Sequence, residues 1–144
     1  MITACLDVKV TMLRSVRTTM NTFTAALNDL LRIFDEVEYV LRDGSYERDH
    51  PQCAAEWRAM YNTLKDAMTG KTYTDIDSMA GVMGYVCGAV IAINCNDPNY
   101  SNQVATALNK LDAFENFVLA YRTYINTLMS QRSNLCTVID PSNP

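Results

Sequence analysis

The side chains best suited to chemistry in this 144-residue chain are its cysteines and its single histidine. The cysteines are Cys5, Cys53, Cys87, Cys95 and Cys136. Their number is odd, no pair has the Cys-x-x-Cys spacing, and three of them lie in or beside apolar stretches. This pattern predicts buried free thiols in a reducing compartment, with a structural disulfide or a zinc site as the alternative. His50 has no histidine partner, which leaves little room for a zinc site or a histidine-based catalytic triad.

Catalytic motifs are missing from the sequence. It contains no glycine-rich phosphate loop, no Gly-x-Ser-x-Gly nucleophile elbow and no paired Glu-x-x-His motif for a di-metal site. Asp35, Glu36 and Glu38 are close in sequence, but a few acids on one helix usually form a solvated face. We therefore expect no enzymatic activity, no metal and no cofactor.

Composition indicates one helical domain over residues 1–144, with residues 137–144 as a flexible tail. Apolar residues make up 49% of the chain and charged residues 19%, which is enough for a sizeable core. The 12 basic and 16 acidic residues form no basic stripe, so nucleic acid is not expected as a partner. Only 5 glycines and 4 prolines are present, which favours helices over many short strands. Neither end reads as a signal peptide or a transmembrane anchor.

Apolar residues spaced three or four apart predict amphipathic helices over residues 2–20, 22–42, 53–69 and 101–132. Asn21 and Thr22 are plausible caps between the first two, and the last region reads as one long helix or two. The apolar stripe of the first helix consists of Ile2, Leu6, Val10, Leu13, Val16 and Met20.

Residues 79–93 differ from these helices because they contain no charge. A helix that is apolar around its whole circumference is usually surrounded by other helices, and this run is too short to span a bilayer. Gly81, Gly84 and Gly88 form a small-residue stripe that would let neighbouring helices approach closely. We therefore predict an all-α bundle in which a central hydrophobic helix, at about 79–94, is wrapped by amphipathic helices. A buried pair of strands is the alternative for this segment.

Two segments resemble homology motifs of the Bcl-2 family of apoptosis regulators. Residues 30–37, Leu-Leu-Arg-Ile-Phe-Asp-Glu-Val, resemble the third motif (BH-3). Its positions here are Ala26, Leu30, Ile33, Asp35 and Val37. Residues 74–93 resemble the first motif, with Gly81 at the motif glycine, and the order of the helices is similar to that of the family. The match covers most of the chain as helix order, but only two short segments as sequence.

The sequence also departs from the family pattern. Val82 stands where the family has an arginine that pairs with an aspartate of the bound helix, and Phe34 occupies a position usually held by a small residue. The second motif, the long loop between the first two helices and the C-terminal anchor are not recognisable. A compact, anchorless chain of this kind is similar to the homologues carried by large DNA viruses.

The resemblance implies an inhibitor of apoptosis that sequesters BH-3 helices of pro-apoptotic proteins such as Bim, Bid, Bak or Bax in a hydrophobic groove. It implies a cytoplasmic protein of the host cell, recruited to mitochondria through these partners. The residues carried over to the groove are Leu30, Ile33, Phe34 and Val37 on one wall, Trp57, Met60, Tyr61 and Leu64 on the facing wall, and Gly81, Val82 and Tyr85 on the floor. Arg58 and Lys65 are candidates to replace the missing arginine.

Other functions fit the same fold. One is a Bcl-2-like scaffold of innate immune signalling, in which the groove is closed. Another is a structural helical assembly protein without a groove ligand, and a pro-death role is a further alternative. Because monomers rarely leave a large apolar groove uncovered, a homodimer that covers it is also a hypothesis.

Overall fold

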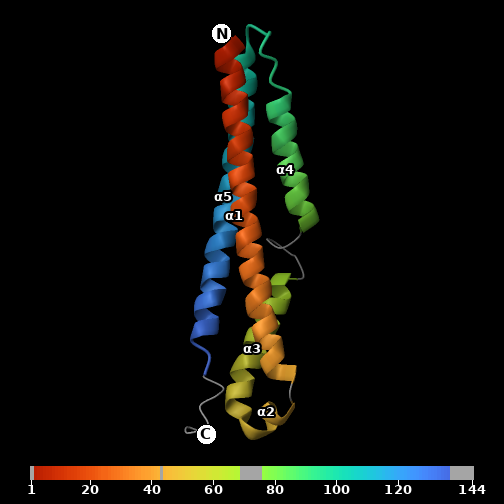
Figure 1. Ribbon diagram of the computed structural model, residues 1–144, viewed down its shortest axis with the longest axis vertical. Helices are drawn as coiled ribbons and strands as arrows, with labels where there is room; N and C mark the ends of the chain where they lie inside the picture. The colour runs from red at the N-terminus through yellow and green to blue at the C-terminus, as the bar shows by residue number, and fades with distance from the viewer. Residues whose placement is uncertain (1, 43, 69–75, 137–144) are drawn as a thin grey trace. The chain divides into compact units, whose positions relative to one another are not determined.

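The computed structural model describes residues 2–42, 44–68 and 76–136, which form five helices and contain no strand (Figure 1). The helices are α1 (Ile2–Arg42), α2 (Gly44–Asp49), α3 (Pro51–Met68), α4 (Ile76–Ile91) and α5 (Tyr100–Ser133). The all-α prediction is confirmed, and the uncharged segment is a helix and not a pair of strands. The predicted tail, residues 137–144, and the Thr74-Asp75 part of the second resemblance lie outside the described residues.

The chain divides into two compact units. Unit 1 comprises Met1–Ala25 and Ile76–Arg122, and unit 2 comprises Ala26–Asp75 and Thr123–Pro144. Since α1 and α5 each contribute to both units, the units share helices although each has its own core.

A single helix, α1, replaces the two helices predicted over residues 2–42. Asn21 and Thr22 do not interrupt it, and the Thr22 hydroxyl donates a hydrogen bond to the Thr18 carbonyl within the helix (3.2 Å). The apolar pattern runs through this point without a change of phase. The buried residues are Cys5, Met12, Val16, Thr19, Phe23, Ala26, Leu30, Ile33 and Val37, at spacings that keep them on one stripe. This continuity lets one helix form.

The buried face near the start of α1 also differs from the predicted one. Leu6, Val10 and Leu13 were expected in the core, but they are exposed, while Cys5 and Met12 are buried. Apolar residues lie on both stripes of this segment, so periodicity alone could not choose between them.

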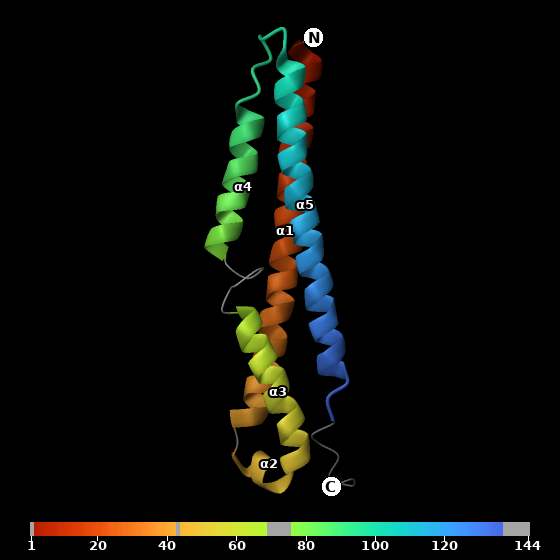
Figure 2. The same cartoon turned by 180° about the vertical axis from the view of Figure 1, so that it is seen from behind.

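In unit 1 the first part of α1, α4 and the first part of α5 lie side by side (Figures 1 and 2). The Phe23 and Tyr121 rings meet in its core, with centroids 4.9 Å apart. Tyr121 is fully buried, and burial raises the pKa of its hydroxyl to about 12. Residues 101–132, predicted as one long helix or two, form a single helix, α5.

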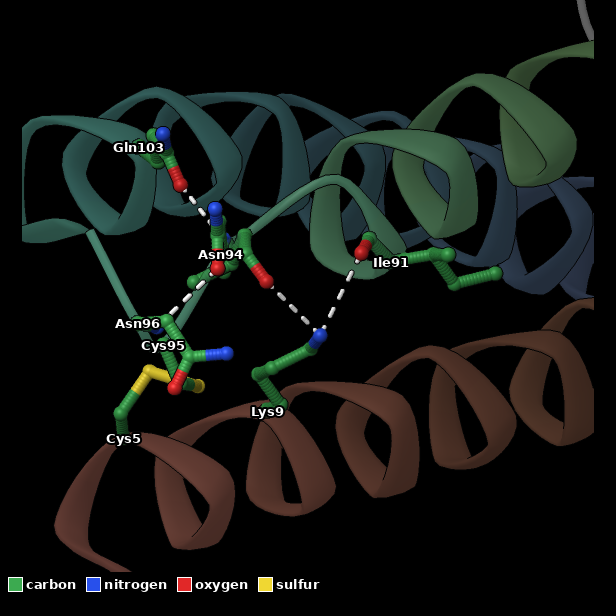
Figure 3. The surroundings of a disulfide bond; sticks show 8 residues. Cys5, Lys9, Ile91, Asn94, Cys95, Asn96 and Gln103 are labelled. Carbon is green, nitrogen blue, oxygen red and sulfur yellow. Dashed lines mark hydrogen bonds between the residues drawn. A yellow bond between two sulfur atoms is a disulfide. The ribbon is translucent and has the colours of Figure 1, made fainter. Parts of the chain in front are cut away.

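A disulfide between Cys5 and Cys95 joins the start of α1 to the turn between α4 and α5 (Figure 3). One helical turn along α1, the Lys9 ammonium donates hydrogen bonds to the carbonyl oxygens of Ile91 (3.3 Å) and Ile93 (2.8 Å). A cation at the C-terminal end of a helix donates hydrogen bonds to carbonyl oxygens that lack helical partners. It also interacts favourably with the negative end of the helix dipole. The end of α4 is therefore held from α1 by one covalent bond and one charged side chain.

Unit 2 is built from α2, α3 and the adjoining parts of α1 and α5. Between α1 and α3 lies the short helix α2, which packs on α3. The helix predicted over 53–69 is present as α3, which buries Ala54, Trp57, Met60 and Leu64 on one stripe. A second disulfide, between Cys53 and Cys136, joins the start of α3 to the segment that follows α5.

The prediction of free thiols is wrong for four of the five cysteines, all of which lie in the described part of the chain. Both pairs have Cα atoms 5.7 Å apart, within the range that a disulfide spans, and only Cys87 remains a thiol. The partners are 90 and 83 residues apart in sequence, so spacing could not reveal the pairing.

Candidate functional site

The exposed side of α4 in unit 1 is unusual because its residues are apolar or glycine. Gly81, Val82, Gly84, Tyr85, Gly88 and Ile91 are all exposed, and together they form what we call the α4 face. Their spacing places them on one side of the helix, opposite the buried Met79, Val86 and Val90. Tyr85 is 64% exposed and Ile91 67%. An apolar face of this kind on a protein surface is typical of an interaction site.

The prediction that this segment is wrapped on all sides by other helices is wrong. A Cβ atom added to Gly81, Gly84 or Gly88 would meet nothing within 4 Å, so the glycine stripe does not mediate close packing here. The helix buries one side against its neighbours in unit 1 and leaves the other uncovered. A helix that is apolar around its whole circumference is therefore not buried on all sides here.

A cavity of about 380 Å³ adjoins the α4 face, between α4 and α5. Its lining consists of Val82, Tyr85, Val86, Asn109, Lys110, Ala113, Phe114 and Phe117. Since Tyr85, Asn109 and Ala113 are exposed, the cavity opens to solvent. Two of the three predicted floor residues, Val82 and Tyr85, thus line a real cavity, and the third, Gly81, lies on the adjoining surface.

Lys110 is the one charged residue among those that line the cavity. Its ammonium lies 4.0 Å from the centre of the Tyr85 ring, a cation–π contact between α5 and α4. The sequence interpretation missed this residue. The available signal was a lysine in line with Ala107, Phe114 and Phe117, at spacings of three, four and seven residues along an otherwise apolar stripe of α5.

The predicted groove walls lie in unit 2, where the structure places them in the core. Leu30, Ile33, Val37, Trp57, Met60 and Leu64 are buried. Phe34 and Tyr61 are half-buried and stack on each other, with ring centroids 5.4 Å apart. The two walls meet at the Phe34–Tyr61 pair, and their other side chains are buried. A ligand groove between them stays a prediction.

Trp57 is covered by the C-terminal part of unit 2. Its indole nitrogen donates a hydrogen bond to the Cys136 carbonyl (2.9 Å), and the Arg132 guanidinium lies 4.8 Å from its ring centre. Arg132 also pairs with Glu36, with 3.0 Å between its Nε and the carboxylate. These contacts account for the burial of Trp57 by structural packing.

The remaining predicted residues are divided between core and surface. Within the BH-3-like motif, Ala26 is buried with the wall residues, and Asp35 is exposed. Of the two bases proposed to replace the missing arginine, Arg58 pairs with Glu47 at 2.8 Å within unit 2, and Lys65 is exposed on α3. Neither is the base that lines the cavity beside Val82, which is Lys110.

Across the described ranges, no three His, Cys, Asp or Glu side chains come together as a metal site. No helix in the same part of the chain is long and apolar enough to cross a membrane. The α4 face and its cavity present apolar area, one aromatic ring and one ammonium group.

Comparison of the chain with protein-family models, with curated proteins and with solved structures finds no match.

Proposed function

We propose that this chain is a non-catalytic binding protein that captures an apolar helix of a partner protein on the α4 face. The observation that carries the proposal is the uncovered, uncharged side of α4, with Tyr85 and Ile91 at its centre and end. A partner helix with apolar anchors at i, i+3, i+4 and i+7 can lay them on such an apolar surface. The glycines add to this, because helices approach closely where side chains are small.

The framework behind the face is suited to such a role. The Cys5–Cys95 disulfide and the Lys9 hydrogen bonds hold the end of α4 in place before any partner arrives. A surface that is ordered in advance loses less conformational entropy on binding. The uncovered area need not be reorganised to accept a helix.

The Bcl-2 resemblance makes BH-3 helices the first ligands to test, with a Bcl-2-like bundle and a pro-survival role as the finer form of the proposal. Its support is the sequence of residues 30–37 and the position of Val82 and Tyr85 beside a cavity. Two observations weigh against that finer form. The BH-3-like segment is the second part of an unbroken 41-residue helix, and the uncharged helix is open on one side.

The disulfides bear on where the protein works. Disulfides form and persist in oxidising compartments, whereas cytosolic thiols are kept reduced. We propose an oxidising compartment in place of the predicted cytoplasm. Labelling of thiols in the protein taken from its native source tests this: we expect one labelled cysteine, Cys87, and five would contradict it.

Calorimetric titration of the oxidised chain, at a concentration where sedimentation finds a monomer, tests helix capture. The ligands are BH-3 peptides of Bim, Bid, Bak and Bax and a designed amphipathic helix with a leucine and alanine face. We expect submicromolar binding of at least one peptide. Binding by the designed helix alone would leave helix capture intact and remove the pro-survival role.

The matched variants are Ile91→Lys on the α4 face and Leu119→Lys on α5, both at exposed apolar positions of unit 1. We expect the first to abolish peptide binding and the second to leave it unchanged. If no peptide binds, or if Ile91→Lys binds as well as the parent chain, the proposal is wrong.

A further inference from the structure

The cavity between α4 and α5 combines an apolar lining with one charged group. Val82, Val86, Phe114 and Phe117 provide an apolar lining, and Lys110 places an ammonium group at the same site. None of the lining residues is acidic. In the described part of the chain Lys110 forms no ion pair, and its own helix carries no acid three or four residues away.

The cation–π contact with Tyr85 does not meet the hydrogen-bonding capacity of Lys110. A cation–π contact uses the charge of the ammonium group, but it supplies no hydrogen-bond acceptor for the three N–H donors. Because Lys110 is half-buried beside apolar side chains, an anion there would be less screened than one on an open surface. The site thus favours a negatively charged group over a neutral or positive one.

The volume sets the scale of the ligand. A cavity of about 380 Å³ is near the lower end of small-molecule pockets, which span roughly 300–1,000 Å³. A small ligand of about a dozen heavy atoms, such as an unbranched chain of about ten carbons that ends in a carboxylate, suits a pocket of this class.

We infer that the cavity binds a medium-chain fatty acid, with Lys110 holding the carboxylate and the valine and phenylalanine side chains surrounding the alkyl chain. The cavity shares Val82 and Tyr85 with the α4 face, but binding of a free fatty acid does not require a captured helix. An acidic or apolar side chain of a captured helix is the competing occupant, and the titration below uses ligands without any peptide.

Titration of the full oxidised chain with decanoate, decanol and decyltrimethylammonium, followed by calorimetry and by amide chemical shifts, tests the inference. We expect decanoate to bind most tightly, with shifts at Lys110 and Ala113. We also expect octanoate to bind more weakly than decanoate by about fourfold for each methylene removed. Equal binding of the three ligands, which share a ten-carbon chain, or shifts confined to unit 2, would overturn the inference.

Two variants test separately the Lys110 charge and the volume of the cavity. Lys110→Met keeps an unbranched side chain over Tyr85 but removes the ammonium group, and we expect it to weaken decanoate about tenfold without changing decanol. Lys65→Met, on α3 in unit 2, is the matched control and should change neither. Ala113→Phe, at an exposed position of the lining, should block all three ligands while circular dichroism confirms an intact fold. If decanoate binds Ala113→Phe or Lys110→Met as well as the parent chain, the site is elsewhere.

Discussion

The two units use similar apolar sequences in opposite ways. In unit 2 the predicted groove walls bury each other, with Leu30 and Leu64 fully enclosed and Phe34 stacked on Tyr61. In unit 1 the most apolar helix of the chain buries one side and leaves Tyr85 and Ile91 largely exposed. The strongest hydrophobic signal in the sequence therefore marks a surface, and the weaker amphipathic signals mark the core. Hydrophobicity alone does not say whether the covering partner belongs to the same chain.

The polar contacts differ in the same sense. Unit 2 surrounds its tryptophan with Arg132, Glu36 and a backbone carbonyl, so that its polar groups complete the packing. Unit 1 uses Lys9 to fix the end of α4 and leaves Lys110 in an apolar cavity. Each unit has one disulfide, so the difference lies in the surfaces and not in the crosslinks.

Truncation of matching isoleucines should give the largest contrast. Ile33, in the core of unit 2, is 2% exposed, and we expect Ile33→Ala to lower the free energy of unfolding by about 2–5 kcal/mol. Ile91, on the α4 face, should cost about 0.5 kcal/mol or less when replaced by alanine. Urea unfolding followed by circular dichroism measures both. Comparable losses would mean that Ile91 supports the fold and that the face is not a free surface.

Removal of either disulfide should lower the free energy of unfolding by roughly 2–4 kcal/mol. The pairs Cys5→Ser with Cys95→Ser, and Cys53→Ser with Cys136→Ser, open loops of 90 and 83 residues. Such similar loops differ in closure entropy by about 0.1 kcal/mol or less. A difference between the two losses of stability, measured by thermal unfolding under oxidising conditions, therefore reflects the native contacts around each disulfide. Cys87→Ser is the control, and a large shift in its midpoint would contradict its assignment as the free thiol.

A single added methyl group tests whether the α4 face is uncovered. Because nothing lies within 4 Å of a Cβ at Gly84, Gly84→Ala should raise the free energy of unfolding by about 0.5–1 kcal/mol through helix propensity. The same substitution should weaken the binding of a partner helix that packs closely on the glycines. A destabilised variant would instead indicate that another element covers this side of α4, as the sequence had predicted.

The smallest expected effect is in unit 2. Arg132→Met removes the pairing with Glu36 and the charge over Trp57, at side chains that are 31% and 38% exposed, and should cost about 0.5–1 kcal/mol. Trp57 is the only tryptophan, so its emission reports the change directly. We expect a shift in emission that the exposed control Arg48→Met does not produce. An unchanged spectrum would mean that Arg132 does not contribute to the surroundings of the indole.

The positions of the helices were predictable because each has its own periodic pattern. The predicted helix over 53–69 corresponds to α3 at Pro51–Met68. The break at Asn21 and Thr22 was wrong because residues that favour caps are tolerated inside a helix whose apolar stripe continues beyond them. The stripe at Leu6, Val10 and Leu13 was wrong because the neighbouring stripe with Cys5, Met12 and Val16 is the one that packs into the core.

Composition and periodicity predicted an all-α chain, the positions of most of its helices and an uncharged segment at residues 79–93. The packing of the helices settled which side of those residues is buried, because a helix apolar all around gives periodicity nothing to distinguish. It also decided the pairing of Cys5 with Cys95 and of Cys53 with Cys136, and the position of Lys110 beside Tyr85. These are contacts between residues far apart in sequence, and they depend on how the helices pack rather than on where they begin and end.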